Sequence, residues 1–108
     1  MELSFDTLDI RDLCLNVQIA IEAVGQHDSF ALLQRLADLA AAHDVAEYLD
    51  LFFEVSVSAD DWELCIPLSS MALIVEQAHT KPPLDDSDQI DWSRVKRVKI
   101  VSLERIDD

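Results

Sequence analysis

The sequence predicts an α+β fold in which a helical hairpin packs on one face of a twisted, mostly antiparallel sheet. Up to about residue 42, apolar residues recur at steps of three and four, which is typical of amphipathic helices. From about residue 51 the apolar period changes to two, which is typical of strands. The 108 residues, half of them hydrophobic, suffice for one core, so we expect a single domain over residues 1–108.

The chain is expected to open with a short strand and a long helix. Residues 2–5 alternate apolar with polar side chains, as a brief strand does. Residues 7–24 then carry one apolar stripe, which indicates an amphipathic helix of about four turns. Gly25, the only glycine, is placed to end this helix, because glycine readily adopts the left-handed conformation that ends helices.

A second helix is expected over residues 28–42, with a further turn at residues 45–48 left open. Two neighbouring apolar stripes run along this helix, so its broad apolar face suits packing against both a helix and a sheet. Small side chains near its end allow close approach. We therefore expect Ala37 and Ala40 to lie buried between the two layers.

Four strands are expected to follow the helices. Residues 51–57 and 62–68 both alternate apolar with polar side chains, and a turn at residues 59–61 joins them as a hairpin. Residues 71–75 are apolar at every position, as expected of a central strand covered on both faces. Residues 95–103 form the last strand. The element order β-αα-ββββ then implies a two-layer domain.

Residues 79–91 are the one loop-like stretch of the sequence. The stretch is long and acidic, and two prolines stiffen it, so we expect a mobile loop. Its aspartates lack the glycine and the closing glutamate of a calcium-binding loop, and the three histidines are scattered along the chain. The sequence therefore predicts neither a metal site nor a cofactor.

The cysteines and the apolar pattern bear on location. Cys14 and Cys65 are isolated from each other and from histidine, and we interpret them as reduced thiols that act as small hydrophobic side chains. The longest apolar runs fall well short of the roughly 20 residues that span a bilayer. The start of the chain lacks the basic and apolar segments of a signal peptide. A cytoplasmic protein is expected.

The charge is strongly acidic and uneven. The net charge is −14, and residues 1–63 hold fourteen acidic residues against only Arg11 and Arg35. Such a surface repels nucleic acid, because affinity for phosphates comes mostly from Lys and Arg. It attracts a basic protein, or it serves only solubility. Weak or absent direct binding of nucleic acid is expected.

Five of the eight basic residues fall between residues 94 and 105. Four of them are candidate partner-binding residues: Arg94, Lys96, Arg97 and Lys99. On a strand, Arg94 and Lys96 would face one way and Arg97 and Lys99 the other. Three interpretations stay open: docking of an acidic partner or RNA, an edge strand charged against aggregation, or internal pairing with carboxylates.

Three phrases resemble HigB-like toxins of the RelE/ParE superfamily in their order and spacing. They are IRDLC at residues 10–14, RLADL at residues 35–39 and IDWSRV at residues 90–95. The resemblance spans the whole chain and implies the β-αα-ββββ fold of that superfamily. It also implies a toxin–antitoxin module, in which the toxin is a ribosome-dependent mRNA endoribonuclease. The implied partner is an antitoxin, often a helix-turn-helix protein that wraps the toxin.

The departures from the family affect its functional residues. The basic residues that the family carries in its first hairpin and on its next two strands are replaced here by Ser56, Pro67 and Ala72. Cleavage of RNA needs a base, an acid and cations that stabilise the charged phosphorane, and these side chains supply none of them. We therefore expect degenerate active-site positions and no catalytic residue.

The sequence favours a catalytically degenerate member of the family that acts through protein–protein binding. One alternative is an active endoribonuclease whose functional residues have moved elsewhere. A second alternative is an acidic mimic of nucleic acid that inhibits a basic protein.

Overall fold

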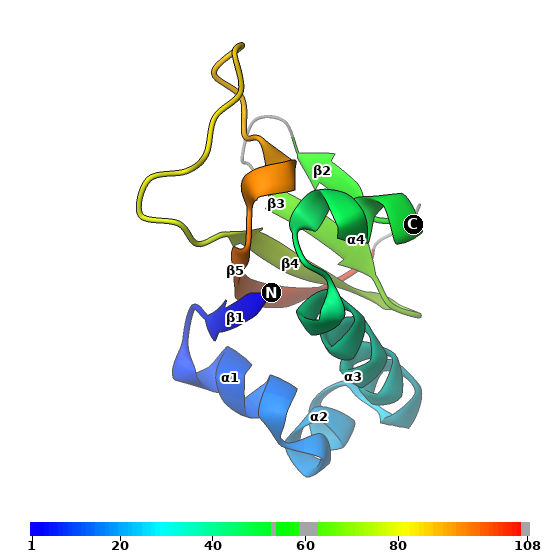
Figure 1. Cartoon of the computed structure of the whole chain (residues 1–108). Helices are drawn as coiled ribbons and strands as arrows, with labels where there is room; N and C mark the ends of the chain where they lie inside the picture. Colours follow the sequence, from blue (N-terminus) through cyan, green and yellow to red (C-terminus); the bar gives the residue numbers. More distant parts are fainter. Residues whose placement is uncertain (53, 59–62, 107–108) are drawn as a thin grey trace.

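The computed structural model describes residues 1–52, 54–58 and 63–106, and these form an α+β arrangement of helices against one mixed sheet (Figure 1). The elements in chain order are β1 (Glu2–Phe5), α1 (Leu8–Leu15), α2 (Val17–Val24), α3 (Gln26–Ala41), α4 (Val45–Leu51), β2 (Ser56–Ser58), β3 (Glu63–Pro67), β4 (Met71–Gln77), the 3-10 helix η1 (Trp92–Arg94) and β5 (Arg97–Arg105).

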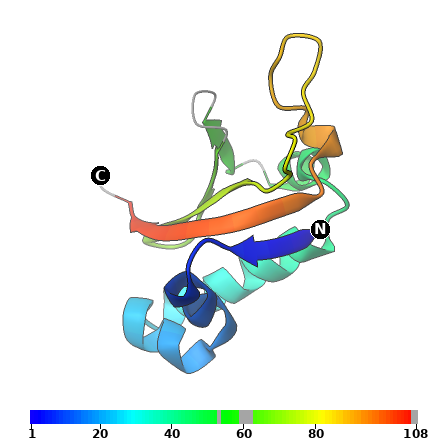
Figure 2. The same cartoon turned by 90° about the vertical axis from the view of Figure 1, so that its left-hand side faces the viewer.

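The sheet has the strand order β1-β5-β4-β3-β2. Strands β2 to β5 pair antiparallel in sequence, as predicted, whereas β1 pairs parallel to β5. The last strand therefore lies inside the sheet, and the interpretation of its charges as protection of an edge is wrong. Figure 2 shows the pronounced curvature of the sheet between β5 and β2.

The helix expected over residues 7–24 is two helices, because the chain breaks at Asn16. This residue has an extended backbone conformation, and its side-chain oxygen accepts hydrogen bonds from the backbone N–H groups of Gln18 (3.0 Å) and Ile19 (3.1 Å). Asparagine competes in this way with the helical backbone. Gly25 ends α2 with a φ of 86°, as predicted.

Helix α3 begins at Gln26, two residues before the expected start. It turns its leucine stripe to the core, where Leu32 and Leu39 are fully buried and Leu36 is 9% exposed. Ala37 and Ala40 are exposed, so the prediction that they lie between layers is wrong. The reason is that the longer leucine side chains fill the space above the sheet, and one helix cannot turn both stripes to it.

The turn left open at residues 45–48 is helix α4, which extends to Leu51. The Asp44 side chain caps it by accepting a hydrogen bond from the Glu47 N–H at 2.8 Å. Val45 and Tyr48 are fully buried, so packing favours the helix over the strand that the alternation predicts from residue 51. Strand β2 is correspondingly short, and the turn expected at residues 59–61 lies outside the described residues.

The core lies between the helices and one face of the sheet. Strand residues of this face, including Leu73 and Val75 of β4, pack with the buried residues of α1, α3 and α4. Strand β4 is central, as predicted. The cover expected on both faces is only partial, because on the second face Ala72 is 5% exposed whereas Ile74 is only partly buried.

The segment between β4 and η1 forms a long hairpin-like loop. An isolated bridge joins Leu84 to Ile90, and the Asp85 side chain accepts hydrogen bonds from the N–H groups of Ser87 (2.8 Å) and Gln89 (3.1 Å). These contacts give the tip of the loop a defined turn. The expected mobility of residues 79–91 stays a prediction.

Candidate functional site

The three degenerate active-site positions share the face of the sheet that the helices leave uncovered. Pro67 lies directly opposite Ala72, and Ser56 lies opposite Cys65, two residues before Pro67. Residues that lie opposite one another point to the same face. Ser56, Pro67 and Ala72 contribute a hydroxyl, a proline ring and a methyl group that is only 5% exposed, and none of them offers a cation to an RNA phosphate. Glu104 of β5 lies directly opposite Ala72, and its negative charge repels a phosphate.

Lys99 reaches the same face but is held by two carboxylates. Its Nζ lies 2.8 Å from Glu76 Oε1 and 3.4 Å from Asp6 Oδ1. The hydrogen bond to Glu76 and the attraction of its charge are the main causes that raise the pKa of Lys99. The pairing also engages the carboxylate of Glu76, which lies on β4. Of the three interpretations of the basic cluster, internal pairing with carboxylates therefore applies to Lys99.

Arg94 lies in η1 and not on a strand, so the alternation expected for the basic cluster does not hold there. Its Nε donates to Asp91 Oδ2 at 2.9 Å, and a terminal nitrogen donates to the Leu84 carbonyl oxygen. These bonds join η1 to the loop before it. Arg94 is thus engaged within the chain.

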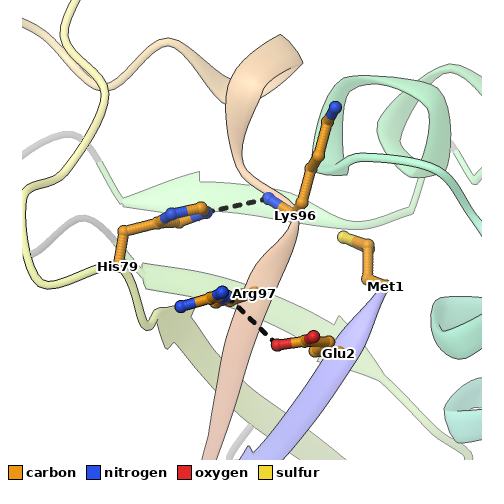
Figure 3. Close-up of a pocket in the computed structure, with 5 residues that line it drawn as sticks. All are labelled: Met1, Glu2, His79, Lys96 and Arg97. Carbon is orange, nitrogen blue, oxygen red and sulfur yellow. Dashed lines mark hydrogen bonds and ion pairs between the residues drawn. The ribbon is translucent and has the colours of Figure 1, made fainter.

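Lys96 and Arg97 line one pocket together with Met1, Glu2 and His79, with a volume of about 520 Å³ (Figure 3). Arg97 Nε lies 3.1 Å from Glu2 Oε2, which leaves its terminal nitrogens for other acceptors. The Lys96 side chain extends away from Arg97 in Figure 3, and no ion pair of its ammonium is found among the described residues. The structure thus brings together two of the four candidate partner-binding residues.

His79 lines the same pocket and accepts a hydrogen bond from the chain just before β5. The backbone N–H of Lys96 donates to His79 Nε2 at 3.0 Å. The imidazole nitrogen Nε2 is thus engaged as an acceptor within the chain. The cationic side chains of Lys96 and Arg97 in the lining suit an oxygen acceptor such as a carboxylate. The sequence did not single out His79 for this pocket, because residues 79 and 96 meet only in the folded chain.

Exposed apolar side chains follow one side of α3 and form the α3 stripe, defined as Phe30, Leu33, Ala37 and Ala40. Phe30 is 52% exposed and Leu33 is 37% exposed, and both alanines are exposed. The spacing of three and four places all four on one side of α3. Other exposed apolar side chains lie on α1 and α2, including Leu15 (69%). The sequence shows this surface as one of the two apolar stripes of the second helix, and we expected that stripe to be buried.

The described residues also bear on metal binding, on a reactive thiol and on a membrane span. Across residues 1–52, 54–58 and 63–106, no three His, Cys, Asp or Glu side chains gather to hold a metal ion. Both cysteines are free, although Cys65 is only partly buried. Burial raises the pKa of the Cys14 thiol to about 11, which leaves it a poor nucleophile. No helix in the described part of the chain has the length and apolar character to cross a membrane.

Comparisons with protein-family models, curated proteins and solved structures found no match to this chain. The geometry of the site and the three phrases that resemble HigB-like toxins are therefore the basis for a proposed function.

Proposed function

We propose that this protein is a catalytically degenerate, HigB-like member of the RelE/ParE superfamily that acts in the cytoplasm by binding a partner protein. The observation that carries the proposal is the exposed α3 stripe, which offers an apolar contact surface on an otherwise acidic molecule. The order of the elements, with helices between a first strand and a four-strand meander, is compatible with the two-layer fold of that superfamily.

The α3 stripe fits an amphipathic helix of a partner. Covering the exposed half of Phe30 contributes roughly 1 kcal/mol, and Leu33 adds a smaller amount. A groove-docked helix presents apolar anchors at matching steps of three and four. With a net charge of −14, two copies of this chain repel each other, whereas a partner with basic residues beside its apolar anchors is attracted. We therefore assign the stripe to a basic, helical partner, and by resemblance to a helix-turn-helix antitoxin.

The uncovered sheet face supports the absence of RNA cleavage in this proposal. Ser56, Pro67 and Ala72 offer no cation, and Lys99 is held by Glu76 and Asp6. Induced expression is therefore expected not to arrest growth. Growth arrest that Arg97→Ala abolishes would instead support the alternative of an active endoribonuclease with relocated residues.

The proposal predicts that a neighbouring gene encodes a helix-turn-helix protein, and the experiment tests the product of that gene. The two purified proteins are titrated by calorimetry. Phe30→Asp is expected to weaken the complex at least about 30-fold, which corresponds to about 2 kcal/mol at an interface hot spot. Leu51→Asp is the matched control, since Leu51 is 64% exposed on α4, outside the stripe. Equal affinities for wild type and Phe30→Asp, or a neighbourhood without such a gene, would overturn the proposal.

A second candidate function is inhibition of a nucleic-acid-binding protein by acidic mimicry. The observation that favours it is the negative charge of residues 1–63, which contain fourteen acidic residues and only two arginines. A mimic binds by long-range attraction, which weakens as the Debye length falls from about 10 Å at 0.1 M salt to about 3 Å at 1 M. A complex formed through the α3 stripe loses only the contribution of the partner's basic residues over that range and keeps its apolar contribution, so the size of the loss in a salt titration separates the two.

A further inference from the structure

Strand β5 continues well beyond the end of its neighbour β1. The pairing of β1 with β5 ends at Phe5 opposite Ile100, and the last hydrogen bond on that side runs from the Asp6 N–H to the Ile100 carbonyl at 2.9 Å. On its other side β5 pairs with β4 as far as Arg105. In the described part of the chain, residues 101–105 therefore have a strand on one side only, as Figure 2 shows.

A small pocket lies beside this open edge, between α1 and β5. Its volume is about 260 Å³, and it is lined mainly by apolar side chains, with Ile10 and Leu13 on the helix and Val101 and Leu103 on the strand. Asp9 adds a carboxylate to the lining. Sites for small molecules usually have volumes of roughly 300–1,000 Å³. The pocket is therefore better matched to a single apolar side chain.

We propose that the open edge of β5 accepts an extended segment of a partner protein as an added strand in line with β1. An unpaired strand edge offers a row of backbone N–H and C=O groups, and extended peptides bind such edges through main-chain hydrogen bonds while pockets read alternate side chains. Five residues of edge, about 17 Å at 3.3 Å per residue, give room for a short strand.

The chemistry of the occupant follows from the lining and the charge. An apolar side chain of the added strand fills the pocket, and a basic residue two positions along the strand, on the same face, pairs with Asp9. A second copy of this chain is disfavoured as the occupant, because each copy carries a net charge of −14. This surface does not include the α3 stripe. The inference rests on the proposed function only in taking the partner to be a protein.

The test uses a synthetic heptapeptide with a central leucine and a lysine two positions to either side of it, titrated into the whole protein. Two N-methylated versions, each blocking the amides of one edge of the peptide, are the matched probes. The peptide is expected to bind, with at least tenfold weaker binding for one N-methylated version. Amide hydrogen exchange of residues 101–105 should slow at least tenfold in the complex. Equal binding by all three peptides, or no binding at 1 mM, would overturn the inference.

Protein variants locate the site. Leu13→Lys is expected to weaken peptide binding at least tenfold, whereas Leu15→Lys on the same helix, outside the pocket, should change it less than twofold. Val101→Lys, which charges the edge itself, tests the site without a change in α1. Phe30→Asp should leave peptide binding unchanged, so failure of the α3 stripe proposal is distinguishable from failure here. A dimer in solution that Val101→Lys dissociates would assign the edge to a second copy and overturn the partner assignment.

Discussion

The carboxylate of Asp28 joins the first turn of α3 to the turn between β3 and β4. It accepts hydrogen bonds from the backbone N–H groups of Ser69 at 3.0 Å and Ser70 at 2.9 Å, and a third from the Ser70 hydroxyl. Asp28 itself is only 6% exposed. We predict that Asp28→Ala destabilises the domain, because it removes all three bonds between the helical layer and the sheet.

The expected loss is about 2–3 kcal/mol in the free energy of unfolding. Each hydrogen bond to a charged group contributes roughly 1.5–3 kcal/mol. The three do not add fully, because Ser69 and Ser70 are exposed and their N–H groups can bond to water in the variant. For a domain of this size the loss lowers the melting temperature by about 10 °C. Urea unfolding followed by circular dichroism measures it.

A second variant and the pH dependence of stability test the same role of Asp28. Ser70→Ala removes only the hydroxyl bond and should cost about 1 kcal/mol. The Ser70 hydroxyl and backbone N–H are the main causes that lower the folded-state pKa of Asp28. The stabilisation is therefore full above the unfolded pKa of about 3.9 and is lost as pH falls through the lower folded value. A wild-type advantage over Asp28→Ala below about 0.5 kcal/mol at pH 7, or one that persists undiminished at pH 2, would refute the argument.

Three other substitutions or reactions test the fold. Asn16→Ala should lower the free energy of unfolding by about 1 kcal/mol through loss of the α2 cap; a gain in stability would indicate that one continuous helix is preferred. Leu39→Ala should cost about 2–5 kcal/mol and Leu33→Ala less than about 1, because only Leu39 is fully buried; equal losses in denaturant unfolding would contradict the assignment of the two stripes. Because burial raises the pKa of Cys14 to about 11, iodoacetamide at pH 8 should alkylate Cys65 first, and mass mapping that finds Cys14 modified at the same rate would argue against its burial.

Local sequence signals determined the class of the fold and several boundaries. The change of apolar period separates the helical part from the strands, Gly25 ends α2, and the apolar run at residues 71–75 lies in a central strand. These features depend on a few neighbouring residues and on backbone conformation, which the sequence shows directly. The break at Asn16 also has a local signal, since asparagine inside a helical pattern competes for backbone N–H groups.

The sequence predicted which basic residues are candidates for the site, but it did not predict which of them pair with other side chains of the chain. The sequence singled out the basic cluster, yet Arg94 bonds to Asp91, and Lys99 is paired with Asp6 and Glu76. His79 joins Lys96 across a loop that the sequence leaves unplaced. These partners come together through strand register, which is set by packing over the whole sheet and not by spacing along the chain.

Tertiary packing alone decided which surfaces stay open. Helix α3 carries two apolar stripes of similar length, and only the position of the sheet selects the leucine stripe for the core and leaves Phe30 and Leu33 exposed. The placement of β5 between β1 and β4 likewise turns an expected edge into an interior strand with one open end. Periodicity defines the faces of an element, but the face that is buried depends on elements distant in sequence, whose approach no local pattern encodes.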